Sequence, residues 1–205
     1  MNPGPPASAA IDWINVARPT ERRSRWLGLT GLPGKHGASV RYPGHTYRGV
    51  LAEDLARLRH ARVRSLLLLV EDAELARLGD PQIVVHGMAA GVEIVRHPIP
   101  DGGVPASMRA MEEILGRVRE AQDRGRAAVA CMGGIGRSGL VAACALVESS
   151  WSSSDAIALV RRARHPQAVE TALQEAFVAG FAAHLTGCEG WLSRSAAISR
   201  ALVVP

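Results

Sequence analysis

The chain has 205 residues, of which 47% are hydrophobic and only 4% aromatic, and it carries a formal net charge of +5. This length suits one ordinary domain with a sizeable core, built here mainly from Ala, Leu and Val. The longest apolar run, SLLLLV at 65–70, is too short to span a membrane, which argues against a transmembrane protein.

The charges and cysteines narrow the class further. Lys35 is the only lysine among 24 basic residues, a bias that we attribute to a GC-rich, bacterial genome. A basic chain attracts anions, but no aromatic-rich surface or finger motif indicates nucleic acid, and phosphorylated substrates fit the charge equally well. Cys131, Cys144 and Cys188 show no CxxC spacing, so we expect neither disulfides nor zinc, and a cytoplasmic protein.

Short apolar segments alternate with helical ones, which predicts a layered α/β domain. In chain order, the first half is expected to contain segments at 12–16 (strand), 25–30 (strand), 52–62 (helix), 64–70 (strand), 72–79 (helix), 81–90 (helix) and 92–99 (strand). Between them, LPGKHG at 32–37 breaks the chain with Pro and Gly. The second half is expected to contain segments at 106–125 (helix), 126–130 (strand), 137–149 (helix), 152–164 (helix) and 168–185 (helix).

The domain organisation follows from these segments. Residues 1–24 are expected to be an N-terminal tail, disordered over 1–10, in which 12–16 is a candidate first strand. Residues 25–185 are expected to form the functional domain, and 186–205 a C-terminal extension of unassigned role.

The stretch AAVACMGGIGRSGLVAACAL at 127–146 places a glycine-rich loop between an expected strand and an expected helix. This arrangement presents unpaired backbone N–H groups to an anion, and the glycines allow the backbone to curl round it. Arg137 follows Cys131 by six positions, so thiol and guanidinium can face one oxyanion, which the planar fork of arginine binds through two parallel bonds. The sequence therefore predicts an oxyanion site with Cys131 as its nucleophile.

The same loop is expected to activate the sulfur. A free cysteine has a pKa near ~8.5 and is mostly protonated at neutral pH. Loop N–H groups, Arg137 and the Ser138 hydroxyl favour the thiolate, and the helix dipole adds only ~0.3–2 kcal/mol. The alternative, an inert core thiol, leaves the glycines unexplained. The residues expected to bind the substrate are Met132, Gly133, Gly134, Ile135, Gly136 and Arg137.

Phosphoryl transfer needs a second residue, because the leaving oxygen must be protonated. Asp101 lies in PIPDGGVP at 98–105, a loop bounded by Pro and Gly that follows a strand. A mobile lid at this place could carry a general acid to the oxyanion site. The alternative is an ordinary turn aspartate.

Several motifs together resemble one family. CMGGIGRSG at 131–139 resembles the Cys-x5-Arg signature of the protein tyrosine and dual-specificity phosphatase superfamily. LGLTGLPG (27–34), HPIPDGG (97–103) and GGIGRSGLVAAC (133–144), in this order, resemble the branch that contains the cyclin-dependent kinase-associated phosphatase. The likeness covers residues 25–185.

The resemblance implies a phosphatase without metal or cofactor, with a mixed, mostly parallel twisted central sheet flanked by helices. Cys131 would attack phosphorus to form a phosphocysteine, while Arg137 and the loop amides would hold the oxygens. Asp101 would protonate the leaving group and then act as base for the hydrolytic water, and Ser138 would help the thiolate to leave. The implied substrate is phosphotyrosine on a protein, with phosphoserine and phosphothreonine as further candidates.

Two positions qualify this resemblance. Most members carry histidine directly before the nucleophile, where this chain has Ala130, so we expect retained activity with a smaller thiolate fraction and a higher pH optimum. Gln174 is either the match to a glutamine that positions the hydrolytic water in some members, or an ordinary exposed helix residue.

Other functions stay open. A phosphoprotein-binding module without catalysis would not require Cys131, Arg137 and Asp101 together. A phosphoinositide or small-molecule phosphatase of the same superfamily usually carries extra loop lysines, where this chain has Met132 and Ile135. A rhodanese-like sulfurtransferase usually has a loop one residue shorter. The expected partner is a phosphorylated protein, with neither nucleic acid nor membrane, and the oligomeric state stays open.

Overall fold

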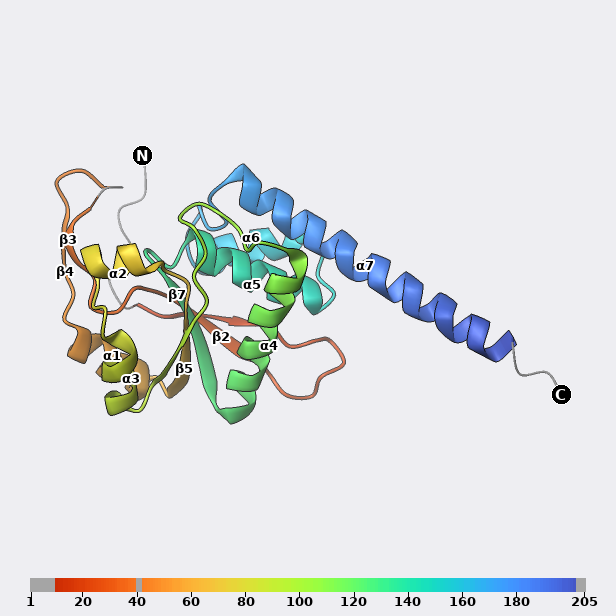
Figure 1. Ribbon diagram of the computed structural model, residues 1–205, viewed down its shortest axis with the longest axis horizontal. Coiled ribbons are helices and arrows are strands. Elements are labelled where there is room, and N and C mark those ends of the chain that lie inside the picture. The colour runs from red at the N-terminus through yellow and green to blue at the C-terminus, as the bar shows by residue number, and fades with distance from the viewer. Residues whose placement is uncertain (1–9, 40–41, 202–205) are drawn as a thin grey trace.

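A five-stranded sheet forms the centre of the protein (Figure 1). The computed structural model describes residues 10–39 and 42–201, with side chains up to 187. Within this part the strands are ordered β1-β2-β7-β5-β6, and only β1 runs antiparallel to its neighbour. The strands are β1 (Asp12–Asn15), β2 (Trp26–Gly31), β5 (Val63–Leu68), β6 (Glu93–Arg96) and β7 (Arg126–Cys131). The predicted strands and the mostly parallel α/β fold are confirmed.

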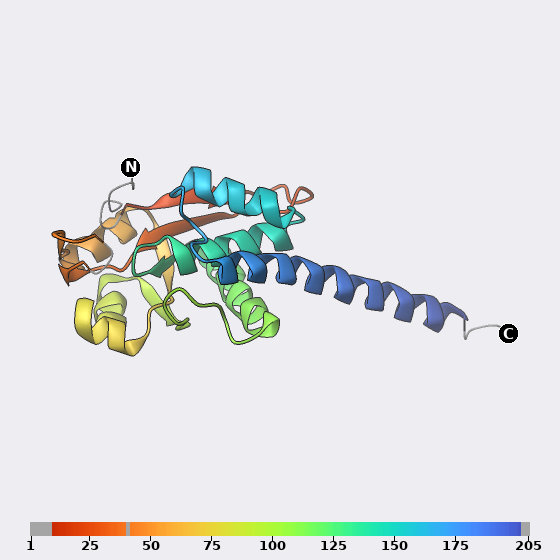
Figure 2. The same cartoon turned by 90° about the horizontal axis from the view of Figure 1, so that it is seen from above.

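Helices cover both faces of this sheet (Figures 1 and 2). One face packs against α1 and α3, and the other against α4, α5, α6 and the first half of α7. The helices are α1 (Leu51–His60), α2 (Asp72–Leu78), α3 (Ile83–Ala90), α4 (Met108–Arg124), α5 (Gly136–Glu148), α6 (Ser153–Ala163) and α7 (Ala172–Ala201). No helix in the described residues is both long and apolar enough to cross a membrane.

The continuous apolar run at 66–70, which begins in the second half of β5, is explained by burial on both faces. Leu67 and Leu69 belong to the apolar cluster beneath α4 to α7, whereas Leu66 and Leu68 belong to the cluster beneath α1 and α3. Successive side chains of a strand point to opposite faces, so a central parallel strand needs apolar residues at every position. All four leucines are fully buried.

A two-stranded hairpin follows β2 where the sequence predicts only a break. Its strands are β3 (His36–Ala38) and β4 (Thr46–Arg48), which pair antiparallel. They have three residues each and are partly exposed, so they carry no hydrophobic alternation that a sequence pattern can detect. Gly34 begins the hairpin in a left-handed conformation with φ +71°, and a Cβ there would lie 2.8 Å from Leu51 Cβ.

The last helix differs from its predicted range of 168–185. Val169 has a positive φ of 58°, which excludes helix at that position, and the Gln174 amide donates to Thr171 Oγ1 as α7 begins. The helix then continues to Ala201, and its C-terminal half extends away from the rest of the protein (Figures 1 and 2).

The tail predicted at 1–10 lies outside the described residues, apart from Ala10. The domain boundaries stay predictions.

Candidate active site

The predicted strand, glycine-rich loop and helix are all present. Strand β7 ends at Cys131 and α5 begins at Gly136, so the glycine-rich loop, residues 131–137, leaves the central region of the sheet at the carboxyl ends of the parallel strands. Open α/β sheets bind ligands at this edge. Cys131 is only 3% exposed and lies at the base of a pocket of about 410 Å³.

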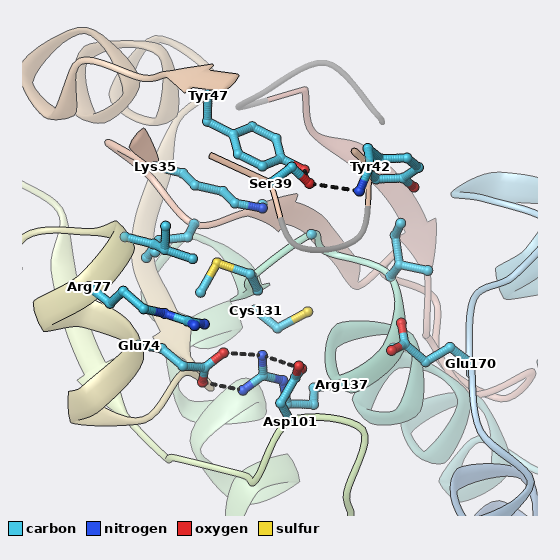
Figure 3. A pocket seen from close by; sticks show the side chains of 17 residues that line it. Lys35, Ser39, Tyr42, Tyr47, Glu74, Arg77, Asp101, Cys131, Arg137 and Glu170 are labelled. Carbon is cyan, nitrogen blue, oxygen red and sulfur yellow. Dashed lines mark hydrogen bonds and ion pairs between the residues drawn. The ribbon is translucent and has the colours of Figure 1, made fainter. Parts of the chain in front are cut away.

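This pocket brings together residues from five separate segments (Figure 3). Its lining includes most of the residues that the sequence predicts, namely Asp101, Cys131, Met132, Gly133, Ile135, Gly136 and Arg137. It also includes residues that the sequence analysis did not assign to the site: Gly31, Leu32, Lys35, Ser39, Tyr42, Tyr47, Glu74, Arg77, Leu78 and Glu170. Of the predicted binding residues, Gly134 is not part of the lining.

Gly134 instead shapes the loop from behind. It has φ +67°, and a Cβ there would lie 2.4 Å from the Thr30 carbonyl oxygen, so no other residue fits. Arg164, which follows α6, donates to the Gly134 and Gly133 carbonyls at 2.9 and 3.0 Å and to the Asp12 carboxylate at 2.6 Å. Because C=O and N–H point in opposite directions in a trans peptide, the amides that follow these carbonyls point away from Arg164.

Arg137 is held at the pocket by two carboxylates and a backbone carbonyl. Its side chain is 1% exposed, and its two terminal nitrogens donate to the two oxygens of Glu74 at 2.6 and 2.8 Å. It also donates to the Ile99 carbonyl at 3.0 Å and forms an ion pair of 2.9 Å with Asp101. Burial opposes the charge, but Glu74, Cys131 and Asp101 outweigh it and raise the pKa of Arg137 above its ordinary value. The guanidinium therefore stays charged and fixed.

Glu74 is a residue that the sequence analysis missed. It lies in the first turn of α2, where its side chain also accepts the Glu71 amide at 2.9 Å in a capping box. Burial raises the pKa of Glu74, but the hydrogen bonds from Arg137 and the Glu71 amide and the charges of Arg137 and Arg77 lower it overall. The sequence does contain a signal for Glu74. It is an acidic residue in a helix that directly follows a buried parallel strand, and such a helix begins at the sheet edge where ligands bind.

Asp101 lines the same pocket and lies beside Arg137 (Figure 3). Its side chain is 72% exposed, and its carboxylate pairs with Arg137. The segment that leads into α7 fastens the Asp101 loop. Thr171 Oγ1 donates to the Gly102 carbonyl and Gln174 Nε2 to the Gly103 carbonyl, each at 3.0 Å.

Gln174 is fully buried, so its interpretation as an ordinary exposed residue is wrong. Its Oε1 accepts the Glu170 amide at 2.9 Å while its Nε2 donates to Gly103, and it does not line the pocket. In this position it connects the Asp101 loop to the start of α7. A role in positioning water stays a prediction, and it requires Gln174 to leave these two bonds.

Two neighbours of Cys131 occupy different environments. Ser138 is buried in α5, and its hydroxyl has no hydrogen-bond partner among the described residues, so it is available to a thiolate. Ala130 points to the opposite face of the sheet and packs in the apolar cluster with Leu66 and Leu68. The effect of alanine at this position on the thiolate stays a prediction.

Lys35 and Arg77 add positive charge that the sequence analysis did not place in the site. Lys35 is 7% exposed, and its Nζ lies 3.6 Å from the centre of the Tyr47 ring. Burial lowers the pKa of Lys35, against the opposing influence of Tyr47, Cys131 and Asp101. Arg77 is exposed and lies one helical turn beyond Glu74.

Among the described residues, no three His, Cys, Asp or Glu side chains are grouped to hold a metal, and the expected metal-free chemistry stays a prediction.

Comparison with known proteins identifies the family of this chain. A family model described as cyclin-dependent kinase inhibitor 3 (CDKN3) matches residues 6–159. The cyclin-dependent kinase inhibitor 3 of Sus scrofa is 31% identical over 194 residues, which cover 90% of this chain and 85% of that protein. The Homo sapiens protein of the same name is 30% identical over 199 residues, which cover 93% and 87% respectively.

Solved structures agree with the sequence matches. A crystal structure of kinase associated phosphatase, with its catalytic-site cysteine replaced by serine, superposes with a TM-score of 0.75 at 25% identity and covers 88% of this chain and 97% of that one. The active form of Tk-PTP superposes with a TM-score of 0.61 at 28% identity and covers 76% and 90%. The chain therefore belongs to the cyclin-dependent kinase inhibitor 3 family, within the protein tyrosine and dual-specificity phosphatase superfamily.

Proposed function

We propose that this protein is a cysteine-dependent phosphatase that hydrolyses phosphotyrosine on proteins through a phosphocysteine at Cys131. The observation that carries the proposal is that Cys131, Arg137 and Asp101 line one pocket, with the arginine fork held by Glu74. A pocket that only bound phosphate would require neither the thiol nor the facing carboxyl group. Membership of the phosphatase family argues against the sulfurtransferase alternative.

The first half of the proposed reaction uses all three residues. The Cys131 thiolate attacks phosphorus, an S–P bond forms, and the bond between phosphorus and the ester oxygen breaks. Arg137 and the loop amides bind the oxygens of the transferred group, where negative charge is spread in the transition state. Asp101 in its protonated form gives its proton to the leaving oxygen, so that tyrosine leaves as a neutral phenol.

The second half returns the enzyme to its starting state. Asp101, now ionised, takes a proton from water as the water oxygen attacks the phosphocysteine. The S–P bond breaks, inorganic phosphate forms, and Cys131 leaves as a thiolate that the Ser138 hydroxyl stabilises. Each residue thus ends the cycle with the protons that it had at the start.

Substrate binding itself prepares Asp101 for this role. Without substrate, Arg137 pairs with the Asp101 carboxylate at 2.9 Å. A phosphate dianion competes with the Asp101 carboxyl group for the same guanidinium nitrogen, which frees this group to face the leaving oxygen. Apolar and aromatic side chains in the wall, including Leu32, Tyr47 and Ile135, suit an aromatic ring and favour phosphotyrosine over a highly charged inositol.

Kinetics on the purified full-length chain test the proposal. We expect wild type to hydrolyse p-nitrophenyl phosphate and a phosphotyrosine peptide, and Cys131→Ser to lose about 10³-fold or more in kcat. Acid quenching during turnover should trap a phosphorylated chain, and peptide mapping should place the phosphate on Cys131. Cys144→Ser is the matched control, because Cys144 is buried in α5 and burial raises the pKa of its thiol.

Two results contradict the proposal. If Cys131→Ser keeps the activity of wild type, Cys131 is not the nucleophile. If wild type binds the phosphopeptide but hydrolyses neither substrate, the protein is a phosphoprotein-binding module.

A further inference from the structure

Two cations form one wall of the pocket. Lys35 and Arg77, which we call the Lys35–Arg77 wall, both line the pocket and extend toward Cys131 from the side opposite Glu170 (Figure 3). Lys35 comes from the turn after β2, where its amide donates to the Leu32 carbonyl at 3.3 Å. Arg77 comes from α2. Neither residue belongs to the glycine-rich loop, so this wall adds two cations to the pocket from other segments of the chain.

The positive charges of Lys35 and Arg77 lack the carboxylate partners that the charge of Arg137 has. Arg137 is paired with both Glu74 and Asp101. In the described part of the chain, neither Lys35 nor Arg77 has a carboxylate within ion-pair distance, and the Lys35 ammonium rests instead on the Tyr47 ring. Burying an ammonium without an opposite charge is costly, which indicates that an anion binds there in the functional state.

The negative groups near this wall do not remove the need for such an anion. Burial outweighs the influence of Tyr47, Cys131 and Asp101 on Lys35, and none of the three forms an ion pair with it. Arg77 and Glu74 act on each other through their charges, but Glu74 forms its ion pair with Arg137. Glu170 lies on the other side of the pocket (Figure 3). When a phosphate occupies the glycine-rich loop, Lys35 and Arg77 remain available for a second negative group.

The choice of lysine at position 35 supports a binding role. All other basic residues of this chain are arginine, so composition alone would favour arginine here too. The ammonium is a compact point charge, which binds phosphate or carboxylate from a narrow space, whereas a guanidinium requires room for its planar fork.

Helix α2 couples the two anion-binding positions. Glu74 and Arg77 are three residues apart and therefore neighbours on the helix surface. Glu74 fixes Arg137 for the first phosphate, and Arg77 extends the positive charge toward the exposed mouth of the pocket. A peptide that lies across this mouth can reach Arg77 with the side chain of a residue next to the phosphotyrosine.

We infer that the Lys35–Arg77 wall selects phosphotyrosine peptides that carry a second anionic side chain, an acidic or phosphorylated residue, directly beside the phosphotyrosine. This inference rests on the proposed function and names its substrate class. The aromatic ring occupies the apolar part of the pocket, its phosphate the glycine-rich loop, and the second anion the Lys35–Arg77 wall.

Matched peptides test the inference. Two phosphotyrosine peptides that differ only in Glu or Gln on both sides of the phosphotyrosine are compared by kcat/KM. We expect wild type to prefer the Glu peptide about tenfold, which corresponds to about 1.4 kcal/mol. Lys35→Met, which keeps most of the apolar stem, and Arg77→Met should each reduce this preference to about twofold or less. The control Arg109→Met removes a cation that is exposed on α4 and should keep the tenfold preference.

The same comparison by binding separates this inference from the proposed reaction. The Kd of both peptides is measured with Cys131→Ser and with Cys131→Ser combined with Lys35→Met, so the result does not require turnover. Equal Kd values for the Glu and Gln peptides overturn the inference. An equal loss of affinity for both peptides when Lys35→Met is added also overturns it, because Lys35 would then act only on the phosphotyrosine that the two peptides share. A preference for an inositol bisphosphate over a monophosphate, without any preference between the peptides, overturns the assignment to peptides.

Discussion

Arg137 and Lys35 are both buried cations of one pocket, but their neighbours differ. Arg137 has a bidentate carboxylate, a second carboxylate and a backbone carbonyl within hydrogen-bond or ion-pair distance. Lys35 has an aromatic ring. The first arrangement keeps the charge and the orientation of the side chain constant, whereas the second leaves the charge available at a cost in stability.

Glu74→Gln should weaken both the fold and the catalysis. It leaves Arg137 buried with an incomplete set of partners, so we expect the free energy of unfolding at pH 7 to fall by about 2 kcal/mol and kcat/KM to fall by about tenfold or more. Urea unfolding and steady-state kinetics measure the two effects. Asp72→Asn is the control, since its side chain is 94% exposed on the same helix. An unchanged kcat/KM would show that Arg137 does not need Glu74 for its orientation.

The pH dependence of stability gives a further check on Glu74. Because the folded protein lowers the pKa of Glu74 below its ordinary value of 4.5, the folded state favours the ionised form. Its contribution is fully present above about pH 4.5 and is lost as the pH falls through the lower pKa of the folded state. Unfolding measured between neutral and acidic pH should therefore show a steeper loss for wild type than for Glu74→Gln. Parallel curves would contradict the assignment.

Lys35→Met should have the opposite effect on stability. Burial lowers the pKa of Lys35, so the charged form costs free energy in the folded state at neutral pH. This cost is fully present below the folded pKa and disappears as the pH rises through it toward the ordinary value of 10.5. We expect the variant to be more stable than wild type by about 1 kcal/mol at pH 7 and the difference to shrink at alkaline pH. A destabilised variant at pH 7 would show that the contact with Tyr47 outweighs the burial of charge.

At the scale of elements, the site depends on segments that never touch the substrate. The loop after α6 and the start of α7 act on the pocket from outside: Arg164 holds the glycine-rich loop, and Thr171 and Gln174 hold the Asp101 loop. The loop contacts the core through Ala168 and Val169, and α7 through Phe177 and Val178. The packing of the two C-terminal helices therefore fixes the relative position of the predicted nucleophile and the predicted acid.

Arg164→Met tests the support of the glycine-rich loop. Loss of its bonds to the Gly133 and Gly134 carbonyls and to Asp12 should lower the free energy of unfolding by about 2–3 kcal/mol. Misplaced loop amides should lower kcat/KM by about tenfold to a hundredfold. Arg162→Met is the matched control, because Arg162 is exposed near the end of the same helix. Equal effects of the two variants would show that Arg164 has no specific role in the loop.

Gln174→Leu tests the support of the Asp101 loop. Without the bond to the Gly103 carbonyl, Asp101 should spend less time at the position from which it protonates the leaving oxygen. This protonation matters most for substrates with a poor leaving group. We expect kcat to fall about tenfold or more for phenyl phosphate and much less for p-nitrophenyl phosphate, with a weakened contribution of the acid to the pH profile. Gln122→Leu is the control. It removes a buried side-chain amide on α4 that donates to the Trp26 carbonyl in β2. An equal fall for both substrates would indicate a purely structural role for Gln174.

At the scale of the whole molecule, the sequence predicts the layers and the central strands well. Strand β5 ends in an apolar run and α4 has a clear amphipathic period, and both elements are found where expected. The hairpin β3–β4 and the start of α7 at Ala172 instead of 168 differ from the prediction, because short exposed strands and a single positive φ at Val169 leave no periodic signal.

The same limit applies to the site. Cys131, Arg137 and Asp101 were predicted because the glycine-rich loop and a short motif carry them. Glu74 and Arg164 were missed because they meet the loop only through the folding of distant segments, and Lys35 was noted only as the sole lysine. Local spacing shows which residues can do chemistry, whereas their supporting partners depend on tertiary contacts.

The position of β7 between β2 and β5 has a consequence for motion. Its amide hydrogens lie inside the sheet and should exchange with deuterium only when the whole domain opens, whereas those of the Asp101 loop should exchange through small local openings. Cys131 therefore stands on the slowest-exchanging part of the protein, while the loops that carry Asp101 and Lys35 can vary. Substitutions in those loops are expected to alter which phosphate esters are accepted without displacing the sulfur.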